Sequence, residues 1–498
     1  MTLAARNRPV KTAPATTRYR VAVLGAGMSG LCMGIQLRKR GIGDFVILEK
    51  ADRVGGTWRE NTYPGIACDV PSHVYSFSFE LNPDWTHAFS GGAEISAYCE
   101  RCVEKYGLAP HLRFGAEVTD LTFAGDHWQI RMADGRELEA DLVVSGLGGL
   151  HLPNRVPLPG KETFGGRMYH TAEWDHSDDL TGRRVAIIGT GASAAQVLPN
   201  IAAQVADVTV FQRSAAWVFP RMAQDIPEKK RQLYRRHPWL MRLNRWRIWL
   251  LMDLLGTLSL RRGSWLNQRL ERGAREFLER EVHDGQVRRK LTPEYAAGCK
   301  RRCISDDYLA SFNRSNVHLV TERITGIEAN GIRDAQGVLH EVDTIIEATG
   351  FKPFDIQEYV DIRGRDGQSL QTAWQERVES YRTVMVPNFP NFFMLLGPNS
   401  ATGHTSALIM IEQQAKFVTD CLRLLAETKA TLVEPTVEAT RRFNFRMQRD
   451  MQRMVFSGGC NAWYTDAHDH NFTLWPYSAL RFCLEFFRPK RKELKTEG

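Results

Sequence analysis

A short stretch about a third of the way along the sequence combines residue types that could move a proton. "FGGRMYHTAEWD" runs from Phe164 to Asp175 and contains His170, Trp174 and Asp175. A histidine beside a carboxylate can act as a general base, because the carboxylate orients the ring and stabilises its protonated form. The same side chains could instead anchor a loop. The elements on either side of the stretch decide between these two interpretations.

Three glycines near the N-terminus have the spacing of a dinucleotide-binding turn. Gly25, Gly27 and Gly30 form G-x-G-x-x-G directly after an apolar strand and at the start of a helix. The first permits a tight turn, the second lets the backbone approach a pyrophosphate, and the third lets the helix pack against the strand. The helix N-terminus then faces the phosphates. Glu49 ends the next strand, where its carboxylate can accept hydrogen bonds from a ribose.

A second fingerprint follows about 160 residues later and differs at the ribose position. The turn and helix start are repeated by Gly189, Thr190, Gly191, Ala192, Ser193 and Ala194. The next strand ends in Gln212, Arg213 and Ser214, where the first unit has an acid. Arg213 can pair with a 2′-phosphate that an acid would repel. The second site is therefore predicted to prefer NADPH to NADH.

The two sites together predict FAD at the first and NADPH at the second. A nicotinamide beside a flavin can donate hydride to it. A disulfide reductase would also carry a C-x4-C pair soon after the first unit. Trp58 stands where such a cysteine would lie, and Cys68 has no partner nearby in the sequence. The sequence therefore argues against a disulfide reductase.

The elements that position these residues repeat in order. Each glycine turn joins a strand to a helix that leads to another strand, and hairpins at 128–148 and 332–351 would close the two units. We predict an α/β fold with two Rossmann-like dinucleotide-binding domains, for FAD and NADPH, and a helical insertion. The expected boundaries are a disordered lead-in at 1–18, the FAD-binding domain at 19–152 and 386–498, the NADPH-binding domain at 153–221 and 298–385, and the insertion at 222–297.

The net charge of +8 is concentrated in that insertion. Residues 228–290 hold seventeen Lys and Arg against seven Asp and Glu. A solvated helical insertion is favoured over a surface for nucleic acid, and a weak peripheral membrane contact is the alternative. Ile248–Leu260 is apolar but only thirteen residues long and contains Asp253 and Gly256, so it is too short to span a bilayer. We expect it to form a buried helix.

The remaining composition points to a cytoplasmic protein. The hydrophobic share of 43% and the charged share of 24% are typical of globular proteins. Nine cysteines without a regular framework fit a reducing compartment. The "CERC" pair, Cys99 and Cys102, is expected to be ordinary helix cysteines, and no metal site is expected. The first twenty residues do not have the pattern of a secretory signal. The oligomeric state stays open.

Two motifs carry a family resemblance. "GGTWRENTYPGIACD" (Gly55–Asp69) is similar to G-G-x-W-x4-Y-P-G-x3-D of type I Baeyer–Villiger monooxygenases. The opening stretch matches their fingerprint F-x-G-x3-H-x3-W-[P/D] at Phe164, Gly166, His170, Trp174 and Asp175. Related flavin-containing monooxygenases that oxygenate N and S usually end that motif in Tyr or Phe. The resemblance extends over residues 19–485.

The resemblance implies a specific chemistry. In the family, reduced FAD reacts with O2 to form a C4a-peroxyflavin, which attacks a ketone and inserts oxygen next to the carbonyl to give an ester or lactone. The anionic intermediate needs a fixed cation and exclusion of water. In "CKRR", Arg301 aligns with the flavin-facing arginine, Lys300 would lie towards the NADPH phosphate, and Asp69 would orient Arg301. Arg302 stands where the family commonly has an apolar residue, so either arginine could face the flavin.

Further contacts are implied by the same resemblance. The flavin would be contacted by Gly56, Thr57, Trp58 and Tyr75, and Trp463 matches a tryptophan that touches the nicotinamide nucleotide. The opening stretch lies between the last strand of the first unit and the first strand of the second. We therefore interpret His170, Trp174 and Asp175 as anchors that couple domain rotation to NADPH placement.

Two alternatives to a ketone monooxygenase stay open at this point. The first is an N- or S-oxygenating flavin monooxygenase, which Trp174 and Asp175 disfavour. The second is a flavin-bearing redox-sensing protein without turnover, docked on a membrane through the basic insertion. The identity of the ketone is not encoded in any motif.

Overall fold

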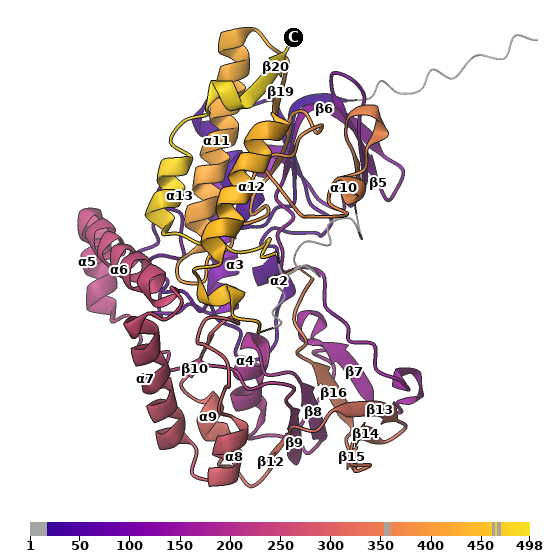
Figure 1. Ribbon diagram of the computed structural model, residues 1–498, viewed down its shortest axis with the longest axis vertical. Coiled ribbons are helices and arrows are strands. Elements are labelled where there is room, and N and C mark those ends of the chain that lie inside the picture. Colours follow the sequence, from indigo (N-terminus) through magenta and orange to yellow (C-terminus); the bar gives the residue numbers. More distant parts are fainter. Residues whose placement is uncertain (1–16, 353–357, 359, 461–463, 466–469) are drawn as a thin grey trace, which may run out of the picture.

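The chain folds into two α/β units joined by several crossings (Figure 1). The computed structural model describes residues 17–352, 358, 360–460, 464–465 and 470–498. The first unit contains an eight-stranded mixed sheet and occupies the upper half of Figure 1. The second contains a five-stranded sheet and occupies the lower half. The predicted fold class is confirmed.

The first sheet is built around the predicted βαβ unit. Its order is β17-β4-β5-β6-β1-β2-β3, with β18 beside β6. The β5–β6 hairpin is the one that the sequence predicts, and β6 returns parallel to β1. The strands are β1 (Arg18–Leu24), β2 (Phe45–Leu48), β3 (Leu112–Arg113), β4 (Val118–Phe123), β5 (Trp128–Met132), β6 (Glu137–Ser145), β17 (Asp361–Arg363) and β18 (Phe392–Met394).

The C-terminal part of the chain returns to this sheet. Strand β18 pairs with β6, and the long helix α11 packs against α1 in a shared apolar core. The helices of this part of the fold are α1 (Met28–Lys39), α2 (Thr57–Glu60), α3 (Gly92–Lys105), α10 (Leu370–Ala373), α11 (Ala407–Thr428), α12 (Val437–Met451) and α13 (Ala479–Glu485). A separate ribbon is formed by β19 (Leu432–Pro435) and β20 (Leu494–Glu497).

The second sheet is parallel throughout and has the order β12-β9-β8-β16-β7. Its central strands are buried, as expected for a sheet covered on both faces. Its strands are β7 (Arg167–His170), β8 (Arg184–Ile188), β9 (Asp207–Phe211), β12 (Val317–Val320) and β16 (Thr344–Glu347). The accompanying helices are α4 (Ala192–Ile201) and α9 (Tyr308–Ser311). An antiparallel ribbon is formed by β13 (Ile324–Glu328), β14 (Gly331–Asp334) and β15 (Leu339–Glu341).

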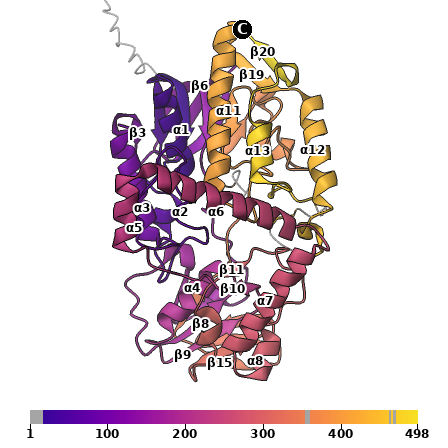
Figure 2. The same ribbon diagram turned by 90° about the vertical axis from the view of Figure 1, so that its left-hand side faces the viewer.

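Four helices occupy the predicted insertion, between β10 (Val218–Phe219) and β11 (Cys303–Ile304). They are α5 (Glu228–Arg236), α6 (Pro238–Ser259), α7 (Trp265–Glu281) and α8 (Gly285–Lys290). Helix α6 lies across the molecule between its upper and lower parts (Figure 2). Its Trp249 joins the core of the first unit, whereas Phe277 and Leu278 of α7 join the core of the second.

The expectation of a buried helix at Ile248–Leu260 is wrong. Only Trp249, Asp253, Ser259 and Leu260 of this segment are buried, and most of its leucines are exposed. Helix α6 lies on the surface of the protein. Only one stripe of its side chains is buried, because the helix runs across the outside of the two units and not through a core. No helix in the described part of the chain is long and apolar enough to cross a membrane.

Candidate active site

At the first glycine turn the backbone itself is the surface that a ligand can approach, because the glycines carry no side chains. Gly25 has a φ of 88° and donates its N–H to the Leu48 carbonyl at 2.7 Å. A side chain on Gly30 would collide with the carbonyl oxygen of Gly25. Gly27 caps α1, and a Cβ there would lie 3.6 Å from the Cα of Gly56. The turn therefore presents bare N–H groups at a helix N-terminus, as a pyrophosphate requires.

Glu49 lies at the carboxyl end of β2, as the sequence predicts, but it already has protein partners. It is buried and accepts hydrogen bonds from Ala26 N at 2.7 Å, Ala51 N at 3.0 Å and Arg59 Nη1 at 3.0 Å. A carboxylate has about four acceptor positions, so a ribose hydroxyl can be added to this set. Arg59 was missed by the sequence analysis. Nothing in the sequence of the Gly55–Asp69 motif distinguishes Arg59 as a residue of the site.

The Gly55–Asp69 segment connects the two glycine turns. At one end, Gly56 has a φ of 53° and lies against Gly27. Further along, Tyr63 Oη donates to Gln196 Oε1 at 3.0 Å, and Gln196 Nε2 donates back to the Ala67 carbonyl at 2.9 Å. Gln196 belongs to α4 of the second unit. This one segment therefore spans from the first nucleotide turn to the helix of the second.

Asp69 ends that segment in an ion pair with Arg301. Arg301 donates to Asp69 Oδ2 from Nη2 at 2.5 Å and from Nε at 3.0 Å. The Asp69 carboxylate raises the pKa of Arg301 further above its usual value, so the guanidinium stays charged. The Arg301 side chain is nevertheless 48% exposed. It is a restrained cation with donors left for a ligand.

The neighbouring Arg302 points elsewhere. Its Nη2 donates to Ser259 Oγ at the end of α6 at 3.2 Å, and its guanidinium lies 5.7 Å from the Phe219 ring centroid. Burial lowers the pKa of Arg302 to about 10. Tyr464, a buried residue that the sequence analysis missed, interacts electrostatically with Arg301. The Asp69 pairing thus distinguishes Arg301 from Arg302.

The second glycine turn repeats the design of the first. Gly189 has a φ of 116°, and a side chain there would collide with the Ala348 carbonyl. Gly191 caps α4, which begins with Ala192 and Ser193, and Ala194 is fully buried against the core. Thr190 Oγ1 donates to the Ser214 carbonyl at 3.0 Å, which connects the turn to the end of β9.

Lys300 and the end of β9 meet beside this turn. Lys300 Nζ donates to Ser214 Oγ at 2.9 Å. Burial, and then repulsion by the Arg213 guanidinium, lower the pKa of Lys300. Two cations held close enough to repel each other are stabilised by an anion between them. The arrangement fits the 2′-phosphate of NADPH.

The remaining flavin-side residues form a small aromatic cluster. Trp58 Nε1 donates to Tyr75 Oη at 2.9 Å, and the two rings meet edge to face with centroids 5.5 Å apart. Thr57 begins α2 directly after Gly56. Trp463 lies outside the described residues, so its predicted contact with the nicotinamide nucleotide stays a prediction.

The Phe164–Asp175 stretch does not contain a histidine–carboxylate pair. His170 is fully buried, its Nδ1 accepts from Ala172 N at 3.1 Å, and burial lowers its pKa. Asp175 pairs with Arg167 instead, from Oδ2 to Nη1 at 2.6 Å. Trp174 meets the Tyr169 ring edge to face at 5.3 Å. A general-base role for His170 would need Asp175 as its carboxylate partner, and Asp175 is paired with Arg167.

Part of the Phe164–Asp175 stretch forms a strand of the second sheet and is not only a linker between the two units. Arg167–His170 forms β7, the edge strand of the second sheet, in register with β16. A side chain on Gly166 would collide with the Asp343 carbonyl, and Phe164 packs in the core beneath the β13–β15 ribbon. The stretch therefore belongs structurally to the NADPH side, and the chain enters that sheet earlier than β8, where we had expected it to begin.

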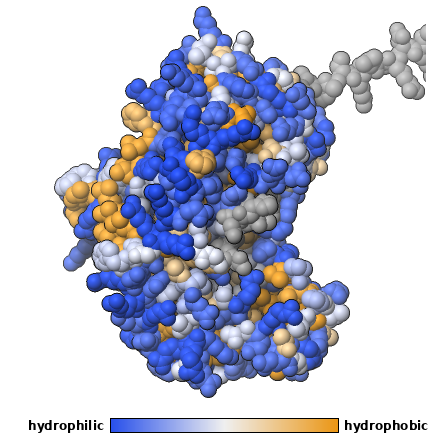
Figure 3. All heavy atoms as spheres, in the orientation of Figure 1, coloured by the Kyte–Doolittle hydropathy of each residue, from blue (hydrophilic) through white to orange (hydrophobic). Residues whose placement is uncertain are grey.

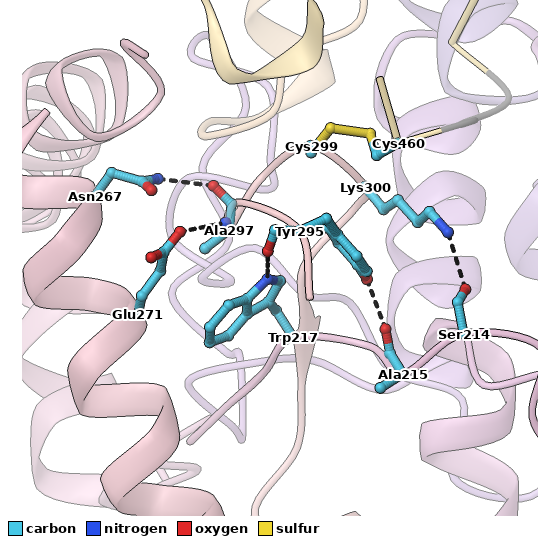
Figure 4. The surroundings of a disulfide bond; sticks show 10 residues. All are labelled: Ser214, Ala215, Trp217, Asn267, Glu271, Tyr295, Ala297, Cys299, Lys300 and Cys460. Atoms are coloured by element: carbon cyan, nitrogen blue, oxygen red, sulfur yellow. Dashed lines mark hydrogen bonds between the residues drawn. A yellow bond between two sulfur atoms is a disulfide. The ribbon is translucent and has the colours of Figure 1, made fainter. Parts of the chain in front are cut away.

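A disulfide anchors the segment that carries Lys300 and Arg301 (Figure 4). Cys299 is bonded to Cys460, which is 161 residues away in the sequence. The nearby Ala297 is held by Glu271 and Asn267 of α7. The expectation of reduced cysteines is therefore wrong for this pair. Cys99 and Cys102 are free buried thiols on α3, as expected.

Thiol titration tests this pairing. Denatured protein purified without reductant is expected to show seven reactive thiols, the number of free cysteines in the structure, and nine after reduction. Cys299→Ser protein should show eight reactive thiols both before and after reduction. A value of seven before reduction would mean that the freed Cys460 has paired with another molecule, which gel electrophoresis without reductant would detect. Nine reactive thiols in the unreduced wild-type protein would contradict the disulfide.

Comparisons with known proteins agree with this geometry. A family model described as pyridine nucleotide-disulphide oxidoreductase matches residues 22–231. A Baeyer–Villiger monooxygenase of Pseudomonas aeruginosa is 42% identical over 476 residues, covering 94% of this chain and 90% of that protein. One of Streptomyces coelicolor is 41% identical over 470 residues, with the same two shares. The structure of cyclohexanone monooxygenase from Rhodococcus sp. Phi1 bound to NADP+ has a TM-score of 0.87 at 26% identity, covering 97% of this chain and 100% of that chain.

An FAD-binding monooxygenase of Aspergillus niger is 34% identical over 508 residues, covering 97% of this chain and 82% of that protein. Together these findings confirm the predicted fold class, the predicted cofactors FAD and NADPH, and the predicted enzyme class. The two Baeyer–Villiger relatives match nearly the whole chain at more than 40% identity, so the likeness is not confined to the nucleotide-binding turns. The chain belongs to the Baeyer–Villiger monooxygenases, which are FAD-containing flavin monooxygenases that use NADP(H).

Proposed function

We propose that this chain catalyses the NADPH- and O2-dependent insertion of one oxygen atom next to the carbonyl of a ketone, giving an ester or lactone. The observation that carries the proposal is the Asp69–Arg301 pair. It places a permanently charged, half-exposed guanidinium at the end of a segment that touches the first nucleotide turn and the helix that follows the second. Its substrates are a small-molecule ketone and O2.

The chain's own residues have distinct tasks in this reaction. FAD supplies the redox chemistry when it is bound and reduced by NADPH. Arg301 stabilises negative charge that develops on oxygen near it, since a fixed cation in a partly buried site needs no reorganisation. Asp69 holds that guanidinium in place, and Lys300 with Arg213 holds the 2′-phosphate. His170, Trp174 and Asp175 fix β7 and its following turn, so that the NADPH side moves as one body.

The domain boundaries are part of this proposal. We assign 19–152 and 360–498 to FAD binding, 153–221 and 298–352 to NADPH binding, and 222–297 to the insertion. The boundary expected at 386 lies too late in the chain, because β17 pairs with β4 of the first sheet and α10 packs in that sheet's core. Support comes from the pairing of β18 with β6 and of β7 with β16, which are long-range contacts within each proposed domain. Limited proteolysis that cuts first near 222–297 would agree with these boundaries.

The competing function is oxygenation of N or S atoms. Trp174 and Asp175 favour the ketone reaction, and the named relatives do as well. We expect cyclic, aryl or linear ketones to give esters or lactones with matching NADPH oxidation, and at least one ketone to exceed every sulfide and amine in kcat/KM. Activity with sulfides or amines but with no ketone would select the competing function.

His170→Ala is expected to slow turnover and to raise the share of NADPH that ends as hydrogen peroxide, without loss of FAD. The reason is that the buried ring sets the turn after β7 and packs on Phe351, with ring centroids 5.6 Å apart. A peroxide assay alongside NADPH oxidation measures the leak. His318→Ala, an exposed histidine on β12 of the same sheet, is the control and should behave as wild type. Unchanged rate and coupling in His170→Ala protein would refute the anchoring role.

A further inference from the structure

One face of helix α6 exposes an unusual run of large apolar side chains. Trp239, Leu243, Trp246, Leu250, Leu254 and Leu258 repeat every three or four residues, and each is exposed, Trp239 by 60% and Leu254 by 61%. This spacing places them on one side of the helix. Leu251 and Leu255 widen the stripe, and Trp265 at the start of α7 is 70% exposed. We call these nine residues the α6 face.

The α6 face is continued by a neighbouring helix. Leu480 and Leu484 of α13 are exposed, and Asp253 of α6 accepts hydrogen bonds from Ala479 N at 2.6 Å and Leu480 N at 3.1 Å. Figure 3 shows the result as apolar surface gathered along the left side of the molecule, over α6 and α13. Soluble monomers rarely expose a contiguous apolar surface of this kind without a partner.

The opposite side of α6 is firmly attached to the protein. The buried Arg245 donates from Nη1 to the carbonyls of His73 at 2.9 Å and Val74 at 3.0 Å. The buried pair Asp253–His404, Oδ1 to Nε2 at 2.9 Å, joins the helix to the loop before α11. Because both attachments use the buried stripe, the apolar face cannot turn inward. It is a preformed surface feature.

Basic residues surround the α6 face. Apart from the buried Arg245, the segment 228–262 contains nine Lys and Arg but only two acids, Glu228 and Asp253. Both acids are already paired, Glu228 with Arg231 and Arg235, and Asp253 with His404. At the end of α6, Arg261 and Arg262 border a hollow that is also lined by Leu258, Trp265 and Leu266. Cationic and apolar groups thus face the same region.

We infer that the α6 face docks on an anionic phospholipid surface. Leucine and tryptophan side chains would enter the boundary between headgroups and acyl chains, where tryptophan is favoured. The surrounding arginines and lysines would meet the lipid phosphates. The charge argues against a second copy of the chain as the occupant, since a two-fold interface would bring like-charged rims together. The 22-residue helix would lie in the plane of the interface.

Flotation with vesicles tests the inference on the full-length protein with its flavin. Wild-type protein is expected to float with vesicles of phosphatidylcholine containing about one-third phosphatidylglycerol, and at least about tenfold more weakly with phosphatidylcholine alone. High salt should reduce the binding. Equal binding to both vesicles, or to neither, would overturn the inference.

Paired variants separate the apolar contribution from the charge. Leu250→Gln/Leu254→Gln and Arg261→Glu/Arg262→Glu should each weaken binding at least about tenfold. Val338→Gln/Phe445→Gln, which changes two exposed apolar residues outside the α6 face, is the matched control and should bind as wild type. Flavin absorbance reports that each variant is folded. Wild-type affinity of Leu250→Gln/Leu254→Gln protein would overturn the inference, and so would a solution dimer that this variant dissociates without any vesicle binding by the wild type.

Discussion

Arg301→Ala protein is expected to bleach its flavin with NADPH at a normal rate but to form ester from a ketone at least about 100-fold more slowly than wild type. Hydride transfer to the flavin depends on the nucleotide sites, which this change leaves intact. Oxygen insertion loses the one cation that Asp69 holds beside the reacting region. Loss of a preorganised charge-stabilising group lowers turnover by about 10² to 10³. Anaerobic reduction followed by stopped-flow absorbance, and product analysis by gas chromatography, measure the two steps.

Arg302→Ala is the matched control for this result. Arg302 contacts Ser259 and the Phe219 ring, so its loss should affect stability more than oxygen insertion. Asp69→Asn should have an intermediate effect, because Arg301 stays charged but is no longer held by a carboxylate. Normal ester formation by Arg301→Ala protein would refute its role. Loss of ester formation in the Arg302→Ala protein alone would assign the role to Arg302.

Arg213→Ala is expected to raise KM for NADPH about 10- to 100-fold and to leave KM for NADH nearly unchanged. A charge-assisted hydrogen bond contributes about 1.5–3 kcal/mol, and only NADPH carries the 2′-phosphate that would make it. Lys300→Ala should act in the same direction, since Lys300 meets Ser214 at the same place. Steady-state kinetics with both coenzymes measures the change.

The control for coenzyme preference is Arg314→Ala. Arg314 is an exposed arginine of the same unit, and its Nε donates a hydrogen bond to Asn316 Oδ1 at 3.3 Å. Its removal should leave both KM values unchanged. An equal rise for NADPH and NADH in Arg213→Ala protein would show that Arg213 supports the site in some way other than binding the phosphate.

Local patterns in the sequence were sufficient for the parts of the site that lie within one βαβ unit. The spacing of Gly25, Gly27 and Gly30 specifies a turn in which only glycine fits, and the structure has that turn. The identity of Arg213 distinguishes the second site from the first in the same way. The Asp69–Arg301 pair spans 232 residues and came from the family resemblance. No local pattern encodes a contact over that distance.

Features decided by packing could not be predicted. Arg59 and Tyr464 become part of the site only through the contacts of the folded chain. An apolar thirteen-residue segment gives the same sequence pattern whether it is buried or exposed, so the orientation of α6 depended on where Arg245 and Asp253 attach it. The Cys299–Cys460 bond joins cysteines 161 residues apart, with no regular spacing to reveal it.

Oxygenation of a ketone under ¹⁸O2 tests the central claim most directly. The purified protein is incubated with NADPH and a panel of cyclic, aryl and linear ketones, and the products are analysed by mass spectrometry. We predict an ester or lactone that contains one labelled oxygen atom, formed in proportion to the NADPH consumed. NADPH consumption that yields only hydrogen peroxide with every ketone, or an ester without label, would contradict the account.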